Sequence, residues 1–141
     1  MNIKLNSVWS DGKAGTGNIR SEGLDATVSI PAEYGGAGTD SNPKELFVAS
    51  TVACFISTLT AMIAGKKLEI VSLSVDTQAK ADDDDFNIVH VAHVKLPAGA
   101  PESDIEKAEG LISKADEICI VGNLARKAGV KIKAGADVSV V

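Results

Sequence analysis

Alternating apolar and polar positions predict a series of strands on both sides of one long helix. Successive side chains of a strand point to opposite faces, so a period of two is typical of a strand with one buried face. Clusters of turn-forming residues divide these runs. The strands are expected at residues 3–9, 15–21, 24–30, 70–80, 86–96, 130–133 and 137–141. Four consecutive aspartates, 82–85, lack the ligand spacing of a calcium loop and predict a solvated hairpin tip.

The long helix is expected to run from Pro43 to about Ala64 and to end at Gly65. Asn42 is suited to cap it, and Glu45 lies three residues later, as in a capping box. Hydroxyl residues interrupt its apolar run, which favours a buried helix over a membrane span. Shorter helices are expected at residues 103–117 and 123–128.

On a helical wheel, this helix carries small and weakly polar residues around Cys54 and larger apolar residues opposite. The Cys54 side holds Phe47, Ser50, Thr51, Ser57, Thr58 and Ala61. The opposite side, expected to form the core, holds Ala49, Val52, Leu59 and Ile63, with Ile56 at its margin. A helix with so few charges must be covered on most sides, which one chain of 141 residues does poorly. We therefore expect a homodimer in which such helices pack together.

Composition narrows the class of protein. With 141 residues, 45% of them hydrophobic, the chain is expected to form one α+β domain over residues 1–141. Its 14 basic and 19 acidic residues are scattered, which argues against a nucleic-acid partner. No signal-peptide pattern begins the chain, so we expect a cytoplasmic protein with no membrane partner. His90 and His93 point to opposite faces of a strand and could not share a metal, so neither a metal nor a cofactor is expected.

The two cysteines, Cys54 and Cys119, are the main candidates for chemistry. In a reducing compartment they are poorly explained as a permanent disulfide, which leaves two interpretations. They are either small buried hydrophobic residues or a reactive pair.

Two segments decide between these interpretations by resemblance. Asn42-Pro43-Lys44-Glu45, preceded by Gly35-Gly36 and followed by Ala53-Cys54-Phe55, resembles the helix of the OsmC/Ohr family. Residues 115–124, around Cys119, resemble the segment that carries that family's second cysteine. The resemblance implies an OsmC-like fold, with antiparallel sheets wrapped around a long buried central helix in an intertwined homodimer.

The resemblance also implies a thiol-dependent peroxidase. In that chemistry Cys54 attacks the peroxide and becomes a sulfenic acid, and Cys119 then condenses with it to a disulfide. An external dithiol, which in Ohr-like members is a lipoyl-bearing protein, reduces the disulfide. An apolar pocket at Cys54 would favour organic or fatty-acid hydroperoxides over hydrogen peroxide.

The chain departs from the family pattern at the acidic residue that supports the cysteine. The family places a glutamate directly after Asn-Pro, where this chain has Lys44, and Glu45 follows one position later. Glu45 lies nine residues before Cys54, so it is about 180° around the helix and roughly 13 Å along it. Helix capping is therefore the stronger explanation for Glu45, although it stays a candidate supporting residue.

The family's thiolate-binding arginine also has no clear counterpart. Arg20, on an early strand, and Arg126, on the last helix, are the candidates, and Lys13 is a weaker substitute. Ile120 and Gly122 follow Cys119 where the peroxidase pattern has proline and serine, so the helix start beside this thiol is expected to differ.

Two other functions remain open at this point. One is a non-catalytic OsmC-like dimer that binds a small apolar ligand, with both cysteines serving as packing residues. The other is a stress-associated structural dimer without a ligand.

Overall fold

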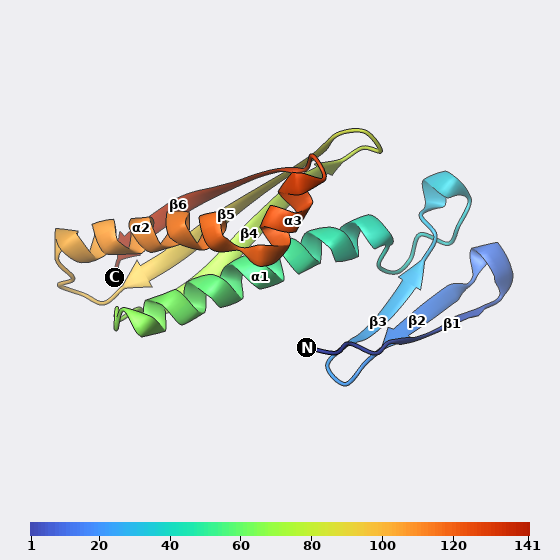
Figure 1. Ribbon diagram of the computed structural model, residues 1–141, viewed down its shortest axis with the longest axis horizontal. Helices are drawn as coiled ribbons and strands as arrows, with labels where there is room; N and C mark the ends of the chain where they lie inside the picture. Colours follow the sequence, from blue (N-terminus) through green and yellow to red (C-terminus); the bar gives the residue numbers. More distant parts are fainter. The chain divides into compact units, whose positions relative to one another are not determined.

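A computed structural model describes all residues, 1–141, and its elements are those of an α+β protein (Figure 1). The chain divides into two compact units, Met1–Phe47 and Val48–Val141. The helix α1 (Pro43–Gly65) begins in the first unit and continues through the second. The expectation of an α+β fold is confirmed, and the single domain over 1–141 stays a prediction.

The first unit is a small antiparallel sheet that lacks a hydrophobic core. Its strands are β1 (Asn6–Ser10), β2 (Thr16–Arg20) and β3 (Asp25–Ser29), in that order, with short 3₁₀ turns η1 (Gly12–Ala14) and η2 (Ala32–Tyr34). No hydrophobic residue before Phe55 belongs to the buried core, and Val8 and Trp9 are exposed. Since a small sheet needs a covered apolar face for stability, this unit requires a further packing surface.

The start of α1 follows the sequence signals. The Asn42 side chain accepts a hydrogen bond from the Glu45 backbone N–H at 3.0 Å, which caps the helix. The Glu45 carboxylate accepts the Ser41 hydroxyl at 2.9 Å, so it fastens the residue before the cap. At the other end Lys67 adopts a left-handed φ of 55°, and the Leu68 N–H returns to the Ile63 carbonyl. Both predicted ends of this helix are therefore confirmed.

One face of α1 is buried, and it agrees only in part with the face that the wheel predicts, since Leu59 and Ile63 are buried as expected. The buried residues are Thr51, Phe55, Leu59 and Ile63, four apart along one ridge. Thr51, expected on the cysteine side, is buried, and Ala49, expected in the core, is exposed. The reason is that Phe55 is the largest side chain near Cys54, so the helix turns to bury it. Thr51 tolerates burial because its hydroxyl donates to the Val48 carbonyl at 2.7 Å.

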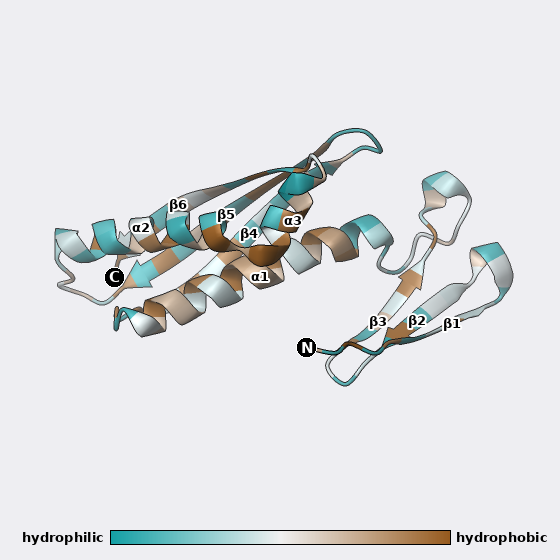
Figure 2. Ribbon diagram, in the orientation of Figure 1, coloured by the Kyte–Doolittle hydropathy of each residue, from teal (hydrophilic) through white to brown (hydrophobic).

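The rest of α1 stays largely uncovered in the single chain. After its hydrophilic first turn, apolar residues recur along α1 in Figure 2. By length and composition alone α1 could cross a membrane, and 22% of its apolar 18-residue stretch is buried. A single such helix is a weak indication of a membrane span, because the core helix of a soluble protein has the same composition.

The second unit is a three-stranded sheet with helices on one face. Strands β4 (Ser72–Ala81) and β5 (Phe86–Leu96) pair antiparallel, whereas β5 and β6 (Lys131–Val140) pair in parallel. The expectation of antiparallel sheets is wrong for this pair, because α2 (Glu102–Ile118) and α3 (Ile120–Lys127) form a crossover that returns the chain in the same direction. Gly135 pairs with Val91, so the two short strands expected at the end are one.

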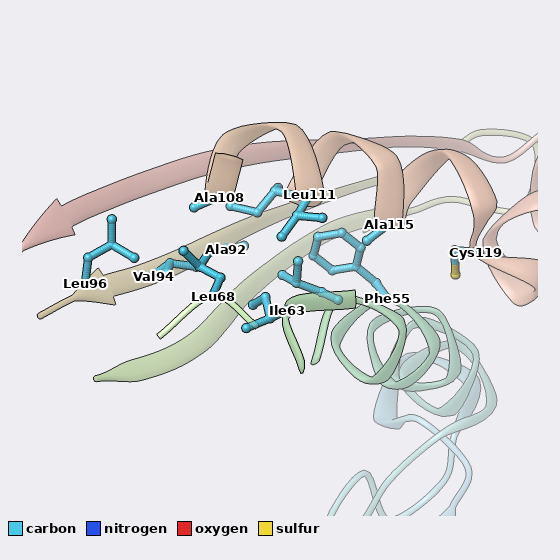
Figure 3. Packing of buried hydrophobic residues seen from close by; sticks show 12 residues of the cluster. Phe55, Ile63, Leu68, Ala92, Val94, Leu96, Ala108, Leu111, Ala115 and Cys119 are labelled. Carbon is cyan, nitrogen blue, oxygen red and sulfur yellow. The ribbon is translucent and has the colours of Figure 1, made fainter. Parts of the chain in front are cut away.

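The core of this unit lies between the sheet and the helices α1 and α2 (Figure 3). Phe55 and Leu59 of α1 pack with Val94 of β5 and Leu111 and Ile112 of α2. The cluster continues to Cys119, at the end of α2. The core therefore fixes the distance between the helix that carries Cys54 and the turn that carries Cys119.

The two histidines of β5 point to opposite faces, as predicted. His90 is buried, stacks on the Phe55 ring with centroids 5.2 Å apart, and shares a hydrogen bond with the Thr77 hydroxyl. Burial lowers the pKa of His90, so it belongs to the core as a neutral ring. His93 lies on the outer face between Asp137 and Asp76, and its hydrogen bond to Asp137, ahead of that to Asp76, raises its pKa.

Candidate active site

The sulfur atoms of Cys54 and Cys119 meet between α1 and the junction of α2 and α3. The Cys119 thiol donates a hydrogen bond to the Cys54 sulfur, and both cysteines are free. Cys54 is partly exposed, whereas Cys119 is only 2% exposed. Figure 3 shows the Cys119 sulfur pointing from the end of α2 toward α1. One thiol is thus open to solvent, and the second lies directly behind it.

Cys119 occupies a sharp break between two helices. Its ψ of 112° ends α2, and α3 begins at the next residue with Cys119 as its N-cap. The Cys119 sulfur accepts the Gly122 backbone N–H at 3.4 Å. A Cβ at position 122 would lie 3.3 Å from that sulfur, so glycine allows this close approach. The sequence predicts that this helix starts at residue 123, three residues after its actual start at Ile120.

The first turn of α3 points its backbone N–H groups at Cys54. Burial alone would raise the pKa of the Cys54 thiol. Hydrogen bonds from the Cys119 thiol, the Val121 N–H, the Thr58 hydroxyl and the Ile120 N–H outweigh burial, and the pKa of Cys54 is lowered. The partial positive charge at a helix N-terminus favours a thiolate in the same way. Cys54 is therefore the more acidic thiol and the better nucleophile.

Cys119 has the opposite electrostatic environment. Burial, together with its hydrogen bond to Cys54, raises the pKa of the Cys119 thiol to about 11. It therefore keeps its proton at neutral pH and is the donor in the pair. A partly exposed thiol with a lowered pKa beside a buried thiol with a raised pKa is the arrangement required when one sulfur attacks a substrate and the other attacks the first sulfur.

Arg126 lies in the same unit but makes other contacts. Its guanidinium donates to the Asp116 carboxylate at 2.7 Å and to three further oxygen atoms around the α2–α3 junction. Hydrogen bonds, rather than the charge of a guanidinium, account for the lowered pKa of Cys54. The expected support of the thiolate by Arg126 stays a prediction.

The other candidate supporting residues belong to the first unit. Arg20 lies on β2, where its Nε is 3.4 Å from the Asp25 carboxylate and its side chain is 68% exposed. Glu45 holds the Ser41 hydroxyl at the start of α1. Lys44, at the family's glutamate position, lies over the Tyr34 ring with its Nζ 5.9 Å from the centroid. The roles of Arg20 and Glu45 in catalysis stay predictions.

Three groups at the site were not predicted as functional. They are the Thr58 hydroxyl and the backbone N–H groups of Ile120 and Val121. Thr58 lies one helical turn after Cys54, and that spacing could have indicated it. The backbone groups had no such signal, because a cysteine is not among the usual N-cap residues and the start of α3 was not recognised.

Comparison with known proteins agrees with the fold. The family model described as OsmC-like protein matches residues 36–135, which include both cysteines and parts of both compact units. The chain belongs to the OsmC family. The resemblance drawn from the sequence around Cys54 and Cys119 is therefore confirmed.

Proteins similar to this OsmC-family chain include one named for organic hydroperoxide resistance and one that is uncharacterized. An organic hydroperoxide resistance protein of Xanthomonas axonopodis pv. citri is 34% identical over 119 residues, covering 82% of this chain and 81% of the relative. The uncharacterized protein YmaD of Bacillus subtilis is 28% identical, covering 94% of this chain and 95% of the relative. The crystal structure of the organic hydroperoxide resistance protein OhrB of Bacillus subtilis shares the fold at a TM-score of 0.63, with 24% identity and coverage of 97% and 98% of the two chains.

Proposed function

We propose that this OsmC protein is a thiol-dependent peroxidase that reduces organic hydroperoxides. The observation that carries the proposal is the hydrogen-bonded cysteine pair, in which Cys54 is partly exposed with a lowered pKa and Cys119 is buried with a raised pKa. The similarity to an organic hydroperoxide resistance protein at 34% identity supports the same substrate class.

In the first step the Cys54 thiolate attacks the distal oxygen of the hydroperoxide. The O–O bond breaks, the alkoxide takes a proton to leave as the alcohol, and Cys54 becomes a sulfenic acid. In the second step the Cys119 sulfur attacks the Cys54 sulfur. The hydroxide that departs takes up the Cys119 proton and leaves as water, so a Cys54–Cys119 disulfide forms.

The third step needs an external reductant. A dithiol attacks the disulfide through a mixed disulfide, and two exchanges return both cysteines to thiols while the dithiol is oxidised. A lipoyl-bearing protein is the reductant proposed for this chain, and the cytoplasm is the reducing compartment proposed for it.

Exposed apolar side chains on α3, the helix whose first N–H groups bond to Cys54, support an organic substrate. Ile120, whose N–H faces Cys54, is 73% exposed, and Leu124, one turn further along α3, is 61% exposed. An alkyl or aryl group on the peroxide would cover this surface, whereas hydrogen peroxide has no such group.

We expect cumene hydroperoxide to be consumed about tenfold faster than hydrogen peroxide, since covering roughly 60 Å² of apolar surface contributes about 1.5 kcal/mol, and a factor of ten in rate corresponds to about 1.4 kcal/mol. The measurement is peroxide consumption at equal concentrations with dihydrolipoamide as reductant. Faster consumption of hydrogen peroxide, or none of either peroxide, would contradict the proposal.

We also propose a homodimer, because two surfaces lack cover in the single chain. The sheet of the first unit has no buried hydrophobic residue, and most of the apolar 18-residue stretch of α1 is not buried. A second copy that covers both surfaces would bury the apolar area that a stable fold requires.

Sedimentation velocity in detergent-free buffer is expected to show a dimer at micromolar concentration. A stable monomer there would contradict the homodimer. Protein that stays in solution only with detergent would instead indicate that a membrane covers α1, and would also contradict it.

A further inference from the structure

Arg126 joins three consecutive elements around the cysteine turn. Its Nη2 donates to the Asp116 carboxylate of α2 at 2.7 Å and to the Ile132 carbonyl of β6 at 3.0 Å. Its Nη1 donates to the Asp116 carbonyl at 3.1 Å and to the Asn123 side chain of α3 at 2.9 Å. We call these contacts the Arg126 clamp.

The Arg126 clamp brackets Cys119. Asp116 lies three residues before Cys119, and its carbonyl also accepts the Cys119 N–H at 3.4 Å. Asn123, four residues after Cys119, donates from its backbone to the Cys119 carbonyl and from its side chain to the Glu117 carbonyl, each at 2.9 Å. Both sides of the break between α2 and α3 are therefore tied to one guanidinium.

Both partners of the ion pair are mostly covered, with side-chain exposures of 28% for Arg126 and 21% for Asp116. A planar guanidinium that makes four hydrogen bonds holds its acceptors in fixed directions, which a lysine ammonium does not. These contacts therefore suit a residue that fixes the positions of α2, α3 and β6 relative to one another. The guanidinium donates to oxygen atoms and not to either sulfur.

We propose that Arg126 is a positioning residue, whose clamp on Asp116, Asn123 and Ile132 holds the first turn of α3 so that the Ile120 and Val121 N–H groups face the Cys54 sulfur. The proposal deepens the proposed function, because it concerns the nucleophile of that reaction. Without the clamp the helix start would tilt or fray, and those two N–H groups would leave the sulfur. The lowered pKa of Cys54, which depends partly on them, agrees with this arrangement.

The test measures the rate at which iodoacetamide alkylates Cys54 as a function of pH, with the Cys54 peptide followed by mass spectrometry. The variants are Arg126→Ala, Arg126→Lys and Asp116→Asn. All three are expected to move the midpoint of the pH profile upward and to slow alkylation at pH 7 by at least about threefold, because only the thiolate reacts.

A direct effect of the Arg126 charge on Cys54 gives a different pattern. Arg126→Lys would then keep the wild-type midpoint, and Asp116→Asn, which removes a negative charge, would lower it. Either result overturns the proposal, as does an unchanged midpoint in Arg126→Ala. If Arg126→Ala fails to fold, the other two variants still decide the question.

Val94→Ala is the control for loss of stability alone. Val94 is buried in the same core but lies at the far end of the cluster from Cys119 (Figure 3). The pH profile of Cys54 alkylation in Val94→Ala is expected to have the same midpoint as in the wild type. A midpoint that rises in Val94→Ala as it does in the clamp variants overturns the proposal. The readout needs no peroxide, so failure of the clamp and failure of the peroxidase activity are observed separately.

Discussion

Replacing Cys54 by serine is expected to lower the rate of organic hydroperoxide reduction by at least about a thousandfold, since a serine hydroxyl with no adjacent base is a far weaker nucleophile than a thiolate. The hydrogen bonds from the Cys119 thiol, the Val121 N–H, the Thr58 hydroxyl and the Ile120 N–H lower the pKa of the Cys54 thiol, but an alcohol is too weak an acid for the same bonds to ionise it. Initial rates with cumene hydroperoxide and excess dihydrolipoamide measure the effect.

The serine variant is a suitable comparison because it changes little else. Cys54 lies at the edge of the buried face of α1, beside Phe55, and serine fits the same space. Thermal unfolding close to that of the wild type would show that the fold is kept. A residual rate within about tenfold of the wild type would mean that the peroxide is reduced elsewhere, and the assignment of Cys54 would be wrong.

Replacing Cys119 by serine is expected to separate the first step from turnover. One equivalent of hydroperoxide should still react at a rate close to that of the wild type, because Cys54 keeps the N–H groups of α3. Steady-state consumption should fall about a hundredfold, because a thiol held in contact acts at an effective concentration that millimolar dithiol does not reach. Stopped-flow traces with one equivalent and with excess peroxide measure the two rates.

Serine at position 119 is also a matched substitution for the helix cap. Its hydroxyl oxygen would accept the Gly122 N–H that the Cys119 sulfur now accepts, so the start of α3 is preserved. Steady-state turnover equal to that of the wild type would contradict a resolving role for Cys119. Loss of the single-equivalent reaction would contradict the separation of the two roles.

The sequence predicts those elements whose signals are local. Asn42, Pro43 and Glu45 give the start of α1, and the alternating runs give β4 and β5, because capping and periodicity act within a few residues. The same local patterns around Cys54 and Cys119 led to the OsmC family.

Features that depend on tertiary packing were predicted less well. The buried face of α1 is set by where Phe55 meets the sheet and α2, which a wheel centred on Cys54 does not include. The parallel pairing of β6 follows from the path of α2 and α3, not from any residue of β6. The strands expected at residues 130–133 and 137–141 are one strand, because residues 134–136 also pair with β5, as Gly135 does with Val91.

At the candidate site, too, local sequence patterns predicted some features and tertiary packing determined the others. The two cysteines were identified from their contexts, but the groups that lower the pKa of Cys54 are mainly hydrogen-bond donors, two of them backbone N–H groups. A search for a charged side chain therefore led to Arg20 and Arg126, whereas the helix start beside Cys119 provides part of the stabilisation through space. The contacts of Arg126 with Asp116 and Ile132, on which its proposed positioning role rests, are indicated by no sequence spacing.

The most direct measurement is the intact mass of the reduced protein after one equivalent of cumene hydroperoxide. The wild type is expected to lose two hydrogen atoms per chain as the Cys54–Cys119 disulfide forms. Cys119→Ser should instead gain one oxygen atom, and Cys54→Ser should not change. An unaltered mass of the wild type, or an oxygen adduct that persists on it, would contradict the account of the two cysteines as a redox pair.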